Sequence, residues 1–183
     1  DTLVILLSGN YSSHDMTWDG GVNGLATTVA EWKQLEGYTG TITFDTTYTG
    51  AFNSLSVTGD VTLGGGTWTH LANTAAEEYR LKVVVGGNVA IAAAVKIDAS
   101  GKGFASGKAR PGSDKGCHAS PMGSAGADKL YGDVKKPEAL GSGSDKGAGG
   151  GAIYIEATGS FANEGQLNVN SFGGAAGSIY VKA

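Results

Sequence analysis

Short apolar-polar-apolar triplets recur along the chain. Four of them begin at Leu55, Leu81, Ile153 and Ile179, so the first and last intervals are equal and the middle one is much longer. A Gly-polar-apolar turn follows each of the first three triplets within a few residues. Alternation of this kind predicts half-buried β-strands, and the fixed spacing predicts an internal repeat.

A repeat of about 26 residues with two or three short strands has the size of one coil of a β-solenoid. The competing all-β interpretation is a sandwich, with strands every 8–12 residues or so. Repetition of the same triplet in a fixed register favours a solenoid, occupying residues 1–183 as a single domain. The side chains expected to face its interior are Leu55, Val57, Val61, Leu63, Leu81, Val83, Val85, Val89, Ile91, Val95, Ile97, Ile153, Ile155, Phe161, Leu167, Val169, Ile179 and Val181.

One short helix is predicted near the N-terminus, over residues 27–37. Val29, Trp32 and Leu35 form an apolar stripe, a Thr and a Glu stand at capping-box spacing, and a glycine follows. We expect this helix to cover the first coils. Nothing comparable follows Ile179 in this sequence, which predicts an uncapped coil there.

The long interval between Leu81 and Ile153 predicts a loop insertion within one coil. Residues 101–147 contain all three prolines, 11 of the 32 glycines and 8 of the 13 basic residues, without strand-like alternation. Eight basic and five acidic residues give this insertion a charge near +3, and the rest of the chain carries −7. Such a basic flap suits either an acidic polysaccharide or docking onto its own solenoid.

Composition excludes several classes of protein. Apolar residues make up 40% and charged residues 16%, which is not the composition of a disordered chain. A net charge of −4 gives no electrostatic reason to expect binding to nucleic acid, and no apolar run suggests membrane insertion. Cys117 is the only cysteine, so no internal disulfide or Cys-x-x-Cys pair exists.

Two glycine-rich stretches carry a resemblance to a known family. Residues 64–70 and 97–104, followed by Tyr131-Gly132, Pro137, residues 140–143 and residues 149–153, resemble Gly-rich parallel β-helix modules of large bacterial secreted and surface adhesin-like proteins. The resemblance covers about residues 53–183. It implies a right-handed parallel β-helix used as a stalk, adhesive segment or accessory domain, located extracellularly or at the cell surface. It transfers no catalytic residue.

Outward-facing aromatic residues are the best candidates for a binding site. The repeat places Tyr154 and Tyr180 in one outward column with Ser56 and Lys82, and Trp68 in another. Flat, rigid aromatic faces suit stacking against sugar rings, which makes Trp68, Tyr154 and Tyr180 candidate carbohydrate contacts. The alternative is that the insertion folds over these rings and buries them.

Catalytic and metal chemistry find little support. The carboxylates stand at different corners of the repeat, and the one pair that shares a column, Asp98 with His70, fits ordinary polar surface. Cys117 and His118 are adjacent, but no acidic or amide partner marks them as catalytic. No metal site and no cofactor are expected. The one candidate ion is Ca²⁺ at the column of Asp60, Asn88 and Ser160, which suits a ladder of side chains on turn amides better.

The sequence therefore favours a non-enzymatic, structural or adhesive module. Its expected partners are neighbouring coils or another copy of itself, and a polysaccharide. A carbohydrate-binding accessory module of a polysaccharide-degrading enzyme is the alternative function, and a polysaccharide lyase or hydrolase is the third.

Overall fold

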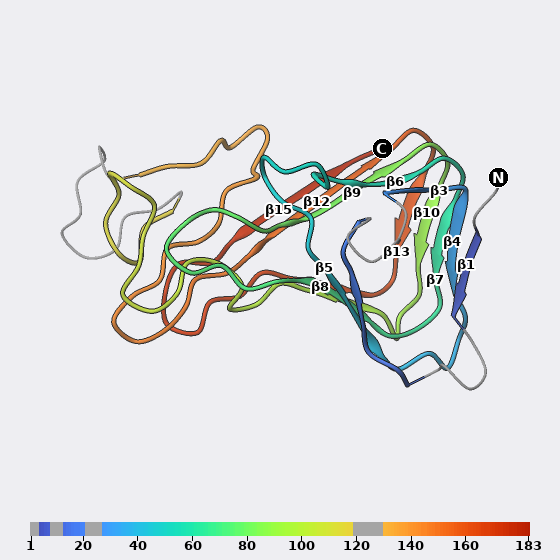
Figure 1. The fold of residues 1–183 in the computed structure, drawn as a ribbon, viewed down its shortest axis with the longest axis horizontal. Helices are drawn as coiled ribbons and strands as arrows, with labels where there is room; N and C mark the ends of the chain where they lie inside the picture. Colours follow the sequence, from blue (N-terminus) through green and yellow to red (C-terminus); the bar gives the residue numbers. More distant parts are fainter. Residues whose placement is uncertain (1–3, 8–12, 21–26, 119–129) are drawn as a thin grey trace.

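The chain passes through three parallel β-sheets in turn. The computed structural model describes residues 4–7, 13–20, 27–118 and 130–183, which form strands and loops and contain no helix (Figure 1). Each strand leads to the next sheet, and every third strand returns to the same sheet. The predicted all-β class is confirmed, and this path is compatible with a parallel β-solenoid.

Each of the three sheets has five strands. Sheet 1 contains β1 (Val4–Leu7), β4 (Glu31–Gln34), β7 (Val61–Leu63), β10 (Val89–Ile91) and β13 (Phe161–Asn163). Sheet 2 contains β2 (Met16–Trp18), β5 (Thr41–Phe44), β8 (Thr67–His70), β11 (Lys96–Asp98) and β14 (Gln166–Asn168). Sheet 3 contains β3 (Thr28–Val29), β6 (Leu55–Val57), β9 (Leu81–Val85), β12 (Ala152–Ala157) and β15 (Ser178–Lys182). Coil 1 is β1–β3, and coils 2 to 5 follow in the same way.

Alternate side chains of the strands fill the space between the three sheets. In coils 3 and 4, all the apolar residues expected to face inward are buried, from Val61 through Ile155. Those of coil 5, such as Leu167 and Ile179, are only partly buried against the same core. Each coil therefore depends on its neighbours for burial of its apolar face, as a stacked repeat requires.

The predicted helix over residues 27–37 is wrong. This segment forms β3 and β4, separated by a corner at Ala30. Val29 and Trp32 are both buried, but they belong to different sheets, and Leu35 is 36% exposed. A corner between two strands shifts the period-2 alternation by one residue, which imitates the spacing of an apolar helical stripe.

In sheet 3 the predicted register is correct for β9, β12 and β15 and wrong between β6 and β9. Ile153 lies beside Leu81 and Ile179, as expected. Leu55, however, pairs with Val83, so this coil is two residues longer than predicted and Ser56 lies beside Val84 instead of Lys82. A shift of two residues keeps the same side chains facing inward, so alternation alone does not distinguish the two registers.

The long connections lie on one side of the solenoid, between sheets 2 and 3 (Figure 1). The insertion leaves coil 4 after β11 and returns at β12, and in Figure 1 its yellow and orange trace projects away from sheet 1. Phe104 and Leu140 of the insertion are buried with Ala152, and Tyr48 packs against them. The insertion thus has a small core of its own.

Glycine lets the returning chain pack directly on its neighbours. Gly150 donates its N–H to Ala175 O at 2.9 Å, and a Cβ on this residue would collide with Val169 O. A larger residue therefore cannot be placed here without moving the backbone. Close approach of backbones explains Gly149 and Gly150, whereas Gly151 leaves room for the His70 side chain.

Candidate functional site

Trp68 lies inside the solenoid. It is 1% exposed and pairs with Ile42 and Ile97 along sheet 2, so the predicted outward orientation is wrong. The cause is the corner before β11, which is one residue longer than the corner before β8. Val61 pairs with Val89, whereas Thr67 pairs with Lys96, so the second interval exceeds the first by one residue. A shift of one residue exchanges the two faces of a strand.

Trp68 belongs to a buried aromatic cluster held by one amide. Its ring centroid lies 5.4 Å from that of Trp32 and 5.0 Å from that of Phe44. The indole N–H groups of Trp32 and Trp68 both donate to Gln34 Oε1, and Gln34 Nε2 donates to Gly65 O at 2.7 Å. Gln34 is 1% exposed, so its hydrogen bonds satisfy the polar atoms of two tryptophans inside the core.

Tyr154 and Tyr180 form the predicted column on sheet 3. Their rings are stacked, with centroids 4.7 Å apart and planes inclined by 22°. The ammonium groups of Lys82 and Lys136 lie 5.1 and 5.3 Å from the Tyr154 ring centroid. Tyr154 is 3% exposed and Tyr180 is half-buried. The insertion, through Lys136, thus covers Tyr154, and the aromatic surface left to a ligand is that of Tyr180.

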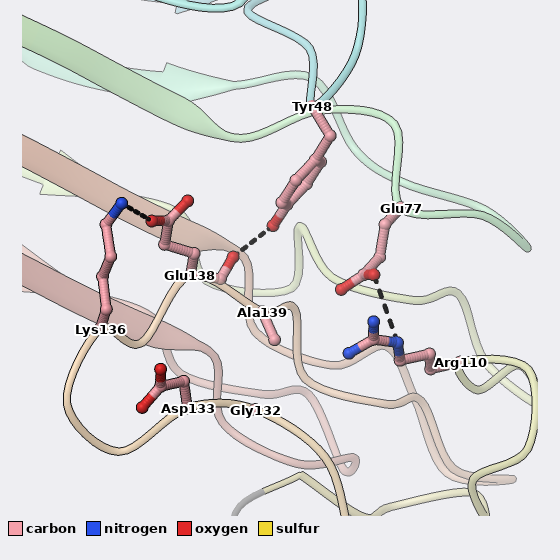
Figure 2. Close-up of a pocket in the computed structure, with 8 residues that line it drawn as sticks. All are labelled: Tyr48, Glu77, Arg110, Gly132, Asp133, Lys136, Glu138 and Ala139. Carbon is pink, nitrogen blue, oxygen red and sulfur yellow. Dashed lines mark hydrogen bonds and ion pairs between the residues drawn. The ribbon is translucent and has the colours of Figure 1, made fainter.

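A pocket of about 390 Å³ opens where the insertion meets the connections of coils 2 and 3 (Figure 2). Tyr48 comes from the loop after β5, Glu77 from the loop after β8, and the rest from the insertion. Figure 2 shows the Tyr48 hydroxyl directed at the Glu138 backbone, and Glu77 facing Arg110. The lining residues are Tyr48, Glu77, Arg110, Gly132, Asp133, Lys136, Glu138 and Ala139.

Ion pairs hold the charged side chains around this pocket. Arg110 Nε lies 3.5 Å from Glu77 Oε2, and Lys136 Nζ lies 3.0 Å from Glu138 Oε1. Glu138 also pairs with Arg80, whose side chain is 7% exposed and whose guanidinium lies over the Tyr48 ring at 4.5 Å. Charged side chains from three segments are thereby fixed relative to one another.

Glu138 is a stable anion in this arrangement. Its burial alone would raise the pKa of its carboxyl, but the hydrogen bond from Lys136 and the charge of Arg80 outweigh burial and hold the pKa below its usual range. Tyr48 donates its hydroxyl proton to Glu138 O at 2.5 Å, and burial together with the Glu77 charge raises the pKa of this phenol. Glu138 is therefore poorly suited to donate a proton.

Asp98 and His70 do not form the predicted column. Asp98 pairs with Asn168 on sheet 2, and its carboxylate accepts the Ser100 N–H at 2.8 Å. His70 is fully buried, with Nδ1 2.7 Å from Leu71 O and Nε2 accepting the Ala152 N–H at 3.2 Å. Desolvation lowers the pKa of His70 to about 4. It is a neutral structural residue.

The column of Asp60, Asn88 and Ser160 is a ladder of side chains on turn amides, as the sequence predicted. Asp60 Oδ1 accepts the Asn88 N–H at 2.7 Å, and Asn88 Oδ1 accepts the Ser160 N–H at 2.9 Å. Among the residues that the structure describes, no three His, Cys, Asp or Glu side chains are grouped to hold a metal ion.

Cys117 and His118 are adjacent but do not act on one another. Cys117 is buried, whereas His118 places Nδ1 3.0 Å from Ala176 O and Nε2 3.3 Å from Ser178 Oγ. Ser178 donates instead to Ala139 O at 2.7 Å, so its proton is already used. These contacts tie the insertion to β15.

The pocket residues were not singled out by the sequence. Tyr48 and Glu77 lie in loops between repeats, and both are far from Glu138 along the chain, which hides their association. The one feature of the sequence that pointed to this region was the cluster of basic residues in the insertion, within an otherwise acidic chain.

In the described ranges no helix is long and apolar enough to cross a membrane. Comparison with protein-family models, curated proteins and solved structures gave no match to this chain.

Proposed function

We propose that this chain is a structural and adhesive β-solenoid module that acts outside the cell and associates edge to edge through coil 5. Coil 5 carries the proposal, because β13, β14 and β15 are each the outermost strand of a sheet. Unpaired strand edges readily pair with another chain.

The outer edge of β15 offers backbone groups for such pairing. Ser178 donates its N–H to Gly151 O at 3.1 Å, on the side of coil 4. Successive N–H groups of a strand point to opposite sides, so those of Ile179 and Val181 point to the outer edge. Val181 is also 37% exposed, which leaves apolar surface beside these amides.

Coil 5 shows little of the protection that exposed edges usually have. Lysine and proline commonly discourage pairing at a strand edge. The one lysine of β15, Lys182, places its Nζ 2.6 Å from Glu156 Oε1, so its charge is compensated. Residues 148–183 contain no proline. This edge is therefore suited to pairing.

A second copy stacked head to tail would continue all three sheets. In each sheet one edge strand belongs to coil 1 and the other to coil 5. Contact between unlike edges is heterologous, and repeated stacking along the direction in which the coils follow one another gives an open rod. We infer that the coils wind in the right-handed sense, which parallel strands joined by crossovers almost always adopt.

Val181→Pro tests edge pairing directly. Proline removes the Val181 N–H, which points outward, and leaves the hydrogen bonds between β12 and β15 in place. We expect self-association to weaken by about tenfold or more, as measured by sedimentation velocity over a range of concentrations.

Val181→Thr is the matched control, because it changes the side chain and keeps the amide. It should associate as the unmodified chain does. Equal association of all three proteins would contradict edge pairing through β15, and so would the absence of association in the unmodified chain.

A carbohydrate-binding accessory function through Trp68, Tyr154 and Tyr180 has less support, since two of these rings are buried. Polysaccharide cleavage, the third candidate, has the least support. Arg80 and Lys136 hold Glu138 of the pocket as a carboxylate, so it is poorly suited to act as a general acid.

A further inference from the structure

We propose that the pocket between the insertion and the loops after β5 and β8 binds a small, neutral saccharide. This gives the adhesive part of the proposed function a class of ligand, and so rests on it. It does not depend on edge pairing, because the described lining comes from the insertion and the loops after β5 and β8, and none of it from coil 5.

The lining offers hydrogen-bond donors and acceptors beside apolar surface. Arg110 supplies N–H donors beyond the Nε used by Glu77, and Asp133 supplies carboxylate acceptors. A sugar hydroxyl both donates and accepts, so it can bridge groups of these two kinds. Tyr48 adds an aromatic surface, which sugar rings contact favourably.

The charged groups are already held in place before any ligand binds. Arg110 lies against Glu77 and over the Tyr131 ring, with its guanidinium carbon 5.4 Å from the ring centroid. Asp133 accepts the Lys135 N–H at 2.8 Å, which orients its carboxylate. Preorganised polar groups lower the entropy lost on binding.

Charge argues against an anionic ligand. Among the described lining residues, three carboxylates, of Glu77, Asp133 and Glu138, face two cations, which gives this part of the lining a net charge near −1. Arg110 and Lys136 each pair with a carboxylate, so neither offers an uncompensated charge to an anion. Metal binding has no support either, since within the described part of the chain no acidic group of three is arranged for it.

The volume and the lining of the pocket narrow the class of ligand further. A volume of about 390 Å³ lies near the lower end of the range for small-molecule sites. Polar and apolar atoms both line the pocket, which suits a sugar, because a sugar carries hydroxyl groups as well as C–H faces. A small ligand rich in hydroxyl groups fits both properties.

A glycan array with neutral and acidic glycans tests this proposal. We expect the chain to bind neutral glycans, and the strongest of these then serves as the ligand for calorimetric titration. Asp133→Asn and Arg110→Gln should each weaken binding by about tenfold, since each removes a charged hydrogen-bonding partner.

Lys115→Ala is the matched control, because Lys115 lies on the same insertion but pairs with Asp145, outside the pocket. Asp133 is exposed and bonds only within its own loop, so its variant should fold normally, as circular dichroism would verify. Binding to acidic glycans alone, no binding to neutral glycans, or unchanged affinity in both pocket variants would each overturn the proposal. Sedimentation of the same proteins reports edge pairing separately.

Discussion

His70 joins two coils of the solenoid from inside the protein. Its ring lies between Leu71 O, just after β8, and the Ala152 N–H at the start of β12. It therefore fixes the point at which the chain returns from the insertion. A Cβ on Gly151 would collide with His70 Nε2, so the neighbouring residue is kept small.

The buried state of His70 predicts a loss of stability in mild acid. Its pKa is about 4 in the folded chain and 6.5 for an unperturbed histidine, so the unfolded state binds the proton more readily. The free energy of unfolding should fall as pH drops from about 6.5 to 4, by about 3 kcal/mol from this residue at most.

Urea denaturation at several pH values measures this effect. His70→Leu should be less stable at neutral pH, because it leaves Leu71 O and the Ala152 N–H without their partner, and should lose less stability in acid. Burial also lowers the pKa of His118, so the comparison must be made between the two proteins. If the free energy of unfolding depends on pH in the same way in both proteins, His70 is not the cause of the acid sensitivity.

Contacts among Tyr48, Arg80 and Glu138, which we call the latch, hold the insertion against the solenoid. Arg80 pairs with Glu138 and lies over Tyr48, and Tyr48 donates to the backbone of Glu138. Arg80 is 6% exposed, and the Glu138 carboxylate compensates its buried positive charge.

Glu138→Gln should loosen the latch. We expect the free energy of unfolding to fall by about 2 kcal/mol, less than for a fully buried pair because the Glu138 side chain is 23% exposed. Limited proteolysis should then cut the insertion faster than in the unmodified chain.

Lys115→Ala is the control here, since the exposed pair of Lys115 with Asp145 should contribute less than about 1 kcal/mol. If the protease cuts the insertion equally fast in the Glu138→Gln and Lys115→Ala variants, the latch does not hold the insertion.

The strands of sheet 3 could be predicted from the sequence, but the corners between strands could not. Alternation located β6, β9, β12 and β15 and their parallel register at the later coils, because the two faces of these strands have opposite polarity. It could not give the lengths of the corners. One extra residue before β11 shifted the alignment of β8 with β11, so Trp68 was assigned to the wrong face. The pocket depends on loops of different coils, which no local pattern reveals.

Three sheets of five strands form one stack, and among the described strands those of coil 1 and coil 5 are the outermost in each sheet. Burial of the apolar side chains decreases from coils 3 and 4 to coil 5, so a further coil on that end would bury more apolar surface. The association end to end that we propose rests on this same feature.

Negative-stain electron microscopy of the unmodified chain, over a series of concentrations, tests association end to end. Edge pairing predicts rods longer than one solenoid, whose length increases with concentration. Compact single particles of constant size at every concentration would contradict it.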